Sequence, residues 1–127
     1  MKQIADKISG SELKILTVLW DASQPLTLTQ IHQELEPTRN WDISTVKTLT
    51  RRLCEKGAVE ARKDGVYHYH ALISREEYSA WSTKTLIDRL FRGSARQLVA
   101  SLVEGEQLTA ADVRELLEEL DRGQDHE

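Results

Sequence analysis

The densest group of side chains able to recognise a ligand lies between residues 44 and 52, where short hydroxyls alternate with long cations. Its members are Ser44, Thr45, Lys47, Thr48, Arg51 and Arg52. In a helix, the spacing of Val46, Leu49 and Leu53 marks an inward face, so this polar group faces outward. Hydroxyls can contact base edges in a DNA groove, and Arg and Lys reach guanine or phosphate. A solvated helix face has the same composition, so both interpretations stay open on this helix alone.

The charge of the chain is unevenly placed. The formal net charge is −4, but residues 1–72 carry a net +1 (10 basic, 9 acidic) and residues 73–127 a net −5 (7 basic, 12 acidic). Between Arg39 and Lys63 there are 7 basic and 3 acidic residues, a local +4. A phosphate-binding surface needs a basic patch while the rest of a protein can be acidic, so the overall charge does not exclude a nucleic-acid partner.

The elements that must position these residues begin at recognisable helix caps. Capping-box spacing occurs at Ser9 with Glu12, Thr27 with Gln30, Ser74 with Glu77, and Ser94 with Gln97. With apolar periodicity and glycine or proline stops, these predict helices over 10–22, 28–35, 43–56, 75–91, 95–104 and 110–122. Asp42 or Ser44 is expected to cap the third helix. Period-two segments on either side of Asp64-Gly65 predict a hairpin.

Three helices followed by a two-stranded wing are typical of a winged helix-turn-helix. We therefore predict a mostly α fold with a small β-wing, made of a winged-helix DNA-binding domain (1–72) and a helical dimerisation region (73–127). The third helix of that fold docks in the major groove, which favours the DNA interpretation of residues 44–52. Arg62 and Lys63, near the wing tip, are expected to contact phosphate. The last three helices carry many apolar residues, which must either meet a second copy or fold back onto the first domain.

Other chemistries have little support in the sequence. Cys54 is the only cysteine, and His68 and His70 lack a third ligand nearby, so we expect no disulfide and no metal site. Motifs of phosphate loops, metalloproteases and catalytic triads are missing, so we expect no cofactor and no enzyme. With no signal peptide and no apolar run of membrane-spanning length, the expected location is the cytoplasm.

Several runs resemble the penicillinase-repressor family of winged-helix regulators (BlaI, MecI and CopY). They are Ser11-Glu12-Leu13, Leu19-Trp20, the stretch from Trp41 to Leu53, Lys56-Gly57, and Arg62-Lys63-Asp64-Gly65 leading to Tyr69. The similarity continues into the last helix and so covers nearly the whole chain. The resemblance implies a homodimeric repressor that reads a TACA/TGTA-type palindrome with Thr45, Lys47 and Thr48, beside Arg51. It also implies dimer contacts through Leu86, Leu90, Leu98, Val99, Leu102, Leu116, Leu117 and Leu120.

Two departures from the family pattern limit what can be carried over. The copper-responsive branch has a cysteine-rich C-terminal motif, which is missing here. The β-lactam-responsive branch is inactivated by a protease at an Asn–Phe bond, whereas the aligned pair here is Ser101-Leu102. Two other functions stay open: a winged-helix module that binds protein instead of DNA, and a ligand-sensing regulator of another winged-helix family.

Overall fold

The computed structural model describes the backbone of residues 2–125 and the side-chain burial of residues 4–123. Within that part, the elements in chain order are α1 (Lys2–Asp6), α2 (Gly10–Asp21), α3 (Leu28–Leu35), α4 (Ile43–Glu55), β1 (Val59–Asp64), β2 (Val66–Ala71), α5 (Arg75–Leu90), α6 (Ala95–Glu104) and α7 (Ala110–Asp125). The chain forms two compact units, Met1–Ser82 and Thr83–Glu127, and the division falls within α5.

The predicted helices and the hairpin are all present, with three differences. The short helix α1 was not predicted. The helix α7 continues past Gly123, where a stop was expected, because Gly123 is not among the glycines with a positive φ and so does not turn the chain out of the helix. Asp42 is the N-cap residue of α4, as one of the two expected options, but its side chain makes no capping hydrogen bond.

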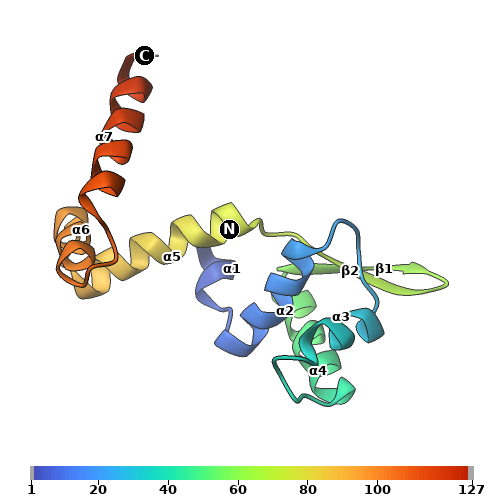
Figure 1. The fold of residues 1–127 in the computed structure, drawn as a ribbon. Coiled ribbons are helices and arrows are strands. Elements are labelled where there is room, and N and C mark those ends of the chain that lie inside the picture. Colours follow the sequence, from blue (N-terminus) through green and yellow to red (C-terminus); the bar gives the residue numbers. More distant parts are fainter. Residues whose placement is uncertain (1, 126–127) are drawn as a thin grey trace. The chain divides into compact units, whose positions relative to one another are not determined.

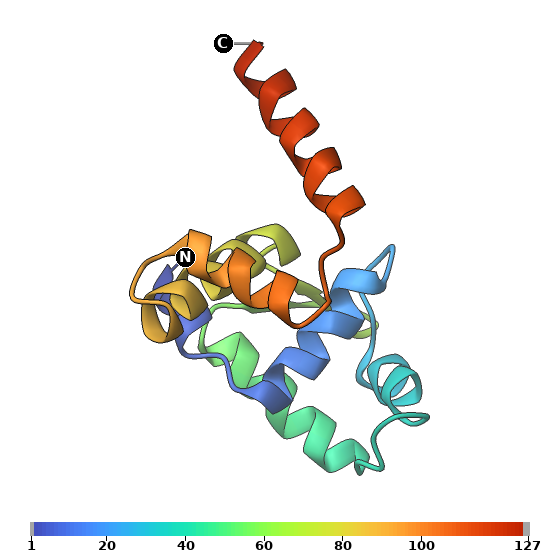
Figure 2. The same cartoon turned by 60° about the vertical axis from the view of Figure 1, so that its left-hand side comes forward.

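In the first unit, α2, α3 and α4 pack against one another and against the hairpin (Figures 1 and 2). The buried apolar residues come from these elements, from α1 and from the connections between them: Ala5, Ile15, Leu16, Leu19, Ile31, Leu35, Val46, Leu49, Leu53, Ala58, Val59 and Ile73. The antiparallel strands pair from Val59 opposite Ala71 to Asp64 opposite Val66. Leu26, before α3, forms a further bridge to Tyr69, which ties the hairpin to the helices.

A buried carboxylate connects the start of α2 to the end of α4. Glu12 is only 1% exposed, and its two oxygens accept hydrogen bonds from Lys56 Nζ at 2.6 and 2.8 Å. It also closes the capping box with Ser9. Burial by itself would raise the pKa of the Glu12 carboxyl, but the hydrogen bonds from Lys56 and Ser9 and the charge of Lys56 outweigh burial and hold that pKa below its ordinary value.

The second unit has a different burial pattern. No side chain described between residues 83 and 123 is fully buried. Its large exposed apolar residues are Leu86, Leu90, Val99, Val103, Leu116, Leu117 and Leu120, which are between 40% and 68% exposed. The helices of this unit therefore have apolar faces that the chain itself leaves in contact with water.

The Glu12–Lys56 pair predicts a pH-dependent stability difference. At pH 7, Glu12→Gln should lower the free energy of unfolding by about 1–3 kcal/mol, because the buried ion pair is broken. A carboxyl with a lowered pKa contributes fully above its unfolded value of about 4.3, and the contribution disappears as the pH falls through the folded value. The difference between wild type and variant should therefore narrow below about pH 4.

Urea denaturation at stepped pH values tests this expectation. The matched control is Glu34→Gln, which removes an exposed carboxylate from α3 and should shift stability little at any pH. A wild-type to Glu12→Gln difference that stays constant from pH 7 to pH 3 would contradict the role given to this pair.

Candidate nucleic-acid interface

The burial of α4 separates its two faces clearly. Val46, Leu49, Thr50 and Leu53 are buried against the rest of the first unit. The side chains predicted to contact DNA lie on the other face: Ser44, Thr45, Lys47, Arg51 and Arg52 are exposed and Thr48 is half-buried. At 3.6 residues per turn, Ser44, Lys47, Thr48 and Arg51 form one continuous stripe, and Thr45 and Arg52 lie beside it.

Contacts at both ends hold α4 in place. Before it, the backbone oxygen of Trp41 lies 2.8 Å from His32 Nε2 of α3, which fixes the turn between the two helices. After it, Lys56 bonds Glu12 and the backbone oxygen of Lys7. Gly57 then takes a φ of +82°, a conformation that favours glycine, and the chain turns toward β1. The outward stripe is therefore presented by a helix fixed at its start and at its end.

Ion pairs divide the basic residues into two groups. Lys56 is bound to Glu12, Arg51 Nη1 lies 2.9 Å from Glu55, and Arg62 Nε lies 2.8 Å from Glu60. Among the described residues, Lys47, Arg52 and Lys63 form no ion pair. The Arg51 and Arg62 pairs are largely exposed, so a phosphate can compete for these arginines at little cost.

The hairpin presents its two basic residues on opposite faces. Lys63 is paired in register with Tyr67, and its Nζ lies 6.0 Å from the centre of the Tyr67 ring. Arg62 is paired with His68, on the other face of the hairpin. Gly65, with a φ of +76°, makes the tight turn between the strands. The expected basic wing therefore has Lys63 and Arg62 near one tip but on different sides.

A groove of about 510 Å³ lies where α4 approaches the hairpin. It is lined by Thr27, Leu28, Thr29, Lys47, Val66, Tyr67 and Tyr69. Lys47 belongs to the predicted set, whereas Tyr67 and the start of α3 were not selected from the sequence. The pairing of Lys63 with Tyr67 across the predicted hairpin was the signal that could have pointed to Tyr67.

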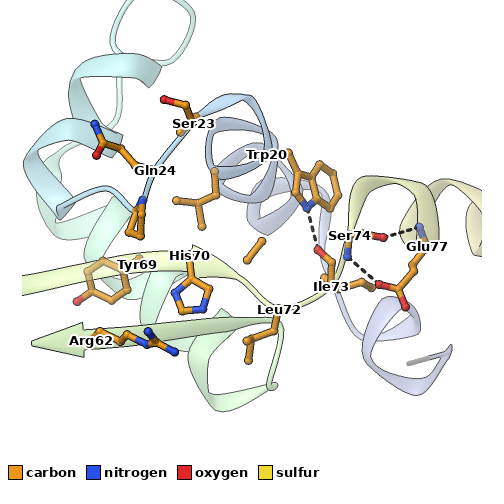
Figure 3. A pocket seen from close by; sticks show the side chains of 14 residues that line it. Trp20, Ser23, Gln24, Arg62, Tyr69, His70, Leu72, Ile73, Ser74 and Glu77 are labelled. Carbon is orange, nitrogen blue, oxygen red and sulfur yellow. Dashed lines mark hydrogen bonds between the residues drawn. The ribbon is translucent and has the colours of Figure 1, made fainter.

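A second cavity, of about 550 Å³, lies between the end of α2, β2 and the start of α5 (Figure 3). Arg62 and His70 are its basic side chains, and both approach the same oxygen of Glu60, at 2.8 and 3.4 Å. The charge of Arg62 is therefore paired with a carboxylate of the same chain. Trp20 lies on the opposite side of the cavity, where its indole nitrogen donates to the backbone oxygen of Ile73.

Other candidate chemistry finds no geometric support in the described part of the chain. Among residues 2–125, no group of three or more His, Cys, Asp or Glu residues could hold a metal ion. Cys54 is half-buried on α4, where burial, followed by the nearby Glu55 charge, raises the pKa of its thiol and keeps it protonated. No helix among the described residues is both long and apolar enough to cross a membrane.

Comparison with known proteins identifies the family. The family model described as penicillinase repressor matches residues 8–122. The chain belongs to the penicillinase repressor family. The penicillinase repressor of Bacillus licheniformis is 30% identical over 122 residues, 95% of this chain and 94% of that protein. The methicillin resistance regulatory protein MecI of Mammaliicoccus sciuri is 27% identical over 111 residues, 87% of this chain and 89% of that protein.

Solved structures agree with this family and with the predicted fold class. The solution structure of the DNA-binding domain of the repressor BlaI is 34% identical, with a TM-score of 0.53, and covers 61% of this chain and 94% of that chain. The monomeric form of Bacillus licheniformis BlaI, solved with the blaP half-operator, is 33% identical with a TM-score of 0.50 and covers 57% of this chain and 88% of that chain. The winged-helix prediction is confirmed. Membership of this repressor family also confirms the expectation of a transcriptional regulator and not an enzyme.

Proposed function

We propose that this member of the penicillinase repressor family binds a palindromic operator as a homodimer and blocks access to the promoter that the operator overlaps. The outward face of α4 is the observation that carries the proposal, since it combines exposed hydroxyls with cations on a helix fixed at both ends. The related BlaI domain was solved with a half-operator, which supports the same partner for this chain. Such a repressor acts in the cytoplasm, where its operator is.

The residues on α4 take different roles in this proposal. Thr45, Lys47 and Thr48 contact base edges, and Arg51 and Arg52 contact phosphate or brace the others. The hydroxyl of Thr48 donates to the backbone oxygen of Ser44 at 3.0 Å, which leaves its methyl group and its remaining acceptor capacity for contacts with DNA. Ser44 lies at the start of the helix, where it is exposed to the backbone of the duplex.

The hairpin supplies contacts outside the major groove. Lys63 has no ion-pair partner among the described residues and lies with Tyr67 beside the groove that Lys47 lines. Arg62 exchanges its exposed Glu60 partner for phosphate. Because cations bound to phosphate release counterions, binding should weaken steeply with salt. A winged-helix module that binds only protein would not show this dependence on DNA, so a titration at two salt concentrations separates the two functions.

The dimer is supported by the apolar faces of the second unit. Val113, Leu116, Leu117 and Leu120 follow the i, i+3, i+4, i+7 spacing of a single helix face, and the three leucines are 52–58% exposed. The same expected dimer set includes Leu86, Leu90, Leu98, Val99 and Leu102 from α5 and α6. A second copy covers such faces and brings two reading helices to half-sites about 34 Å apart, one turn of DNA.

Inactivation by a protease has less support than DNA binding. The aligned bond, Ser101–Leu102, lies inside α6, where the backbone oxygen of Ser101 accepts a hydrogen bond from Gly105. Leu102 is half-buried. Proteases prefer exposed loop tips, so cleavage here requires local opening of α6 first. We therefore propose repression through dimeric DNA binding and assign no release step to this bond.

Selection of bound fragments from the source genome tests the proposed function most directly. We expect recovered fragments to share a palindrome and to lie at promoters. Recovery of unrelated sequences, or no enrichment at all, would overturn sequence-specific repression by this chain.

One mutational test of the proposed function concerns base reading. Lys47→Ala and Thr48→Ala should each weaken operator binding by about 1–3 kcal/mol and weaken binding to random DNA much less, because base contacts carry the specificity. Lys14→Ala is the matched control, since it removes an exposed cation from α2. Fluorescence anisotropy on operator and random duplexes measures both losses. Equal losses on the two duplexes would mean that these residues contact only phosphate.

Another mutational test of the proposed function concerns the dimer. Leu116→Asp or Leu117→Asp should produce monomers that no longer retard operator DNA at wild-type concentrations, since the advantage of linked half-sites is lost. Ala111→Asp adds the same charge on the opposite side of α7 and should stay dimeric. Sedimentation velocity and gel retardation provide the two readouts. A monomeric variant with undiminished retardation would refute dimeric operator binding.

A further inference from the structure

The start of α5 is bound to the end of α2 by a group of contacts that DNA reading does not use. We call this group the α5 latch, and its members are Trp20, Asp21, Ile73, Arg75, Tyr78 and Trp81. All of them lie in the first compact unit, which extends to Ser82. They connect α2, which packs against the reading helix α4, to a helix that continues beyond that unit.

Hydrogen bonds fix the position where α5 begins. Trp20 Nε1 donates to the backbone oxygen of Ile73 at 2.9 Å, and Ile73 is itself buried (Figure 3). Ser74 and Glu77 then form a reciprocal capping box, with both bonds at 3.0 Å. The first turn of α5 is therefore held to α2 through a backbone atom and is closed by its own cap.

Side-chain contacts fix the rotation of α5 about its axis. The Arg75 guanidinium lies 5.7 Å from the Trp20 ring centre and pairs with Asp21. The Tyr78 ring is 5.9 Å from Trp20, and the Trp81 ring is 5.9 Å from Tyr78. Residues 75 and 78 share one face of α5 and both contact Trp20, so these contacts oppose rolling and tilting of α5 on α2, whereas the Tyr78–Trp81 contact lies within α5.

The helix contains no flexible residue beyond the latch. From Arg75 to Leu90 its sequence has neither glycine nor proline, and it crosses the division between the compact units without a break. Whatever arrangement the second unit takes, α5 therefore leaves the first unit from a fixed start and with a fixed rotation.

We propose that the α5 latch makes the repressor selective for one spacing between operator half-sites, with Trp20, Arg75 and Tyr78 as positioning residues. The inference rests on the proposed dimer. Linked modules bind a second site best when the link matches the distance between the sites. If α5 could pivot on α2, the α4 helix of the second copy would occupy many positions. Its effective concentration at the correct half-site would then be lower, and the dimer would also bind operators with other spacings.

The test compares three duplexes: an operator recovered by the genomic selection, the same operator with two base pairs inserted between its half-sites, and a single half-site. The insertion moves one half-site by about 7 Å and rotates it by about a fifth of a turn. The latch variant is Arg75→Met with Tyr78→Ala. Its matched control, Lys84→Met with Ser79→Ala, removes one cation and truncates one side chain at exposed positions of the same helix. Trp20→Phe, which loses the bond to Ile73 and leaves a smaller ring to contact Arg75 and Tyr78, is the milder second variant.

We expect the latch variant to remain dimeric by sedimentation and to bind the single half-site within about twofold of wild type. On the native operator its Kd should rise by about tenfold, and its preference for native over inserted spacing should fall several-fold. The control variant should keep the wild-type preference. If the double variant fails to fold, Trp20→Phe decides, with the same direction and a smaller loss of preference.

Each contrary result has a separate meaning. A folded, dimeric latch variant that keeps the wild-type spacing preference overturns the latch proposal alone. So does a half-site Kd that rises as much as the operator Kd, since the latch would then only stabilise the first unit. A wild-type dimer with no spacing preference also overturns the latch proposal. A wild-type protein that binds the operator only as a monomer refutes the proposed dimer, and the latch proposal with it.

Discussion

The burial of one carboxylate constrains the rest of the DNA-binding unit. Glu12 is almost fully removed from water, so its charge has to be compensated by bonds within the chain. Lys56 supplies the charge, and Ser9 supplies a backbone donor. Because Lys56 is the C-cap residue of α4, compensating Glu12 also fixes where α4 ends relative to α2. The apolar residues Val46, Leu49 and Leu53 then determine which face of α4 is turned outward.

The two compact units obtain stability in different ways. The first unit contains the fully buried apolar residues, which come from α1, α2, α3, α4, β1 and their connections. The second has short helices whose leucines and valines remain partly in water in a single chain. Short helices gain most of their stability from packing, not from intrinsic propensity. In the dimer that we propose, association with a second copy would therefore contribute to the folding of the second unit as well as to DNA binding.

Local sequence signals predicted the elements well but not the contacts between them. The capping residues and the apolar spacing predicted the observed bounds of α3 and α6, since Thr27 and Ser94 are their N-cap residues and their apolar stripes are regular. The helix α1 has only five residues and no recognisable cap, so nothing in the local pattern separated it from a loop. Lys56 is 44 positions from Glu12, and Trp20 is 53 from Ile73. Such pairings depend on the assembled fold, which is why Lys56 was counted in the basic patch when it is a structural cation.

The hydrogen bonds and ion pairs on the outward face of α4 are separate from those that hold the fold together. On the outward face of α4, the bonds of Thr48 and Arg51 stay within the helix, to Ser44 and Glu55. Lys47 and Arg52 form no ion pair with any residue the structure describes. Substitutions there change the surface that we propose contacts DNA while leaving the Glu12 pair and the apolar core intact, so under this proposal base preference can change with little loss of stability. Glu12, Lys56 and Trp20 cannot be substituted with as little loss of stability, because each of them forms a contact between elements far apart in the chain.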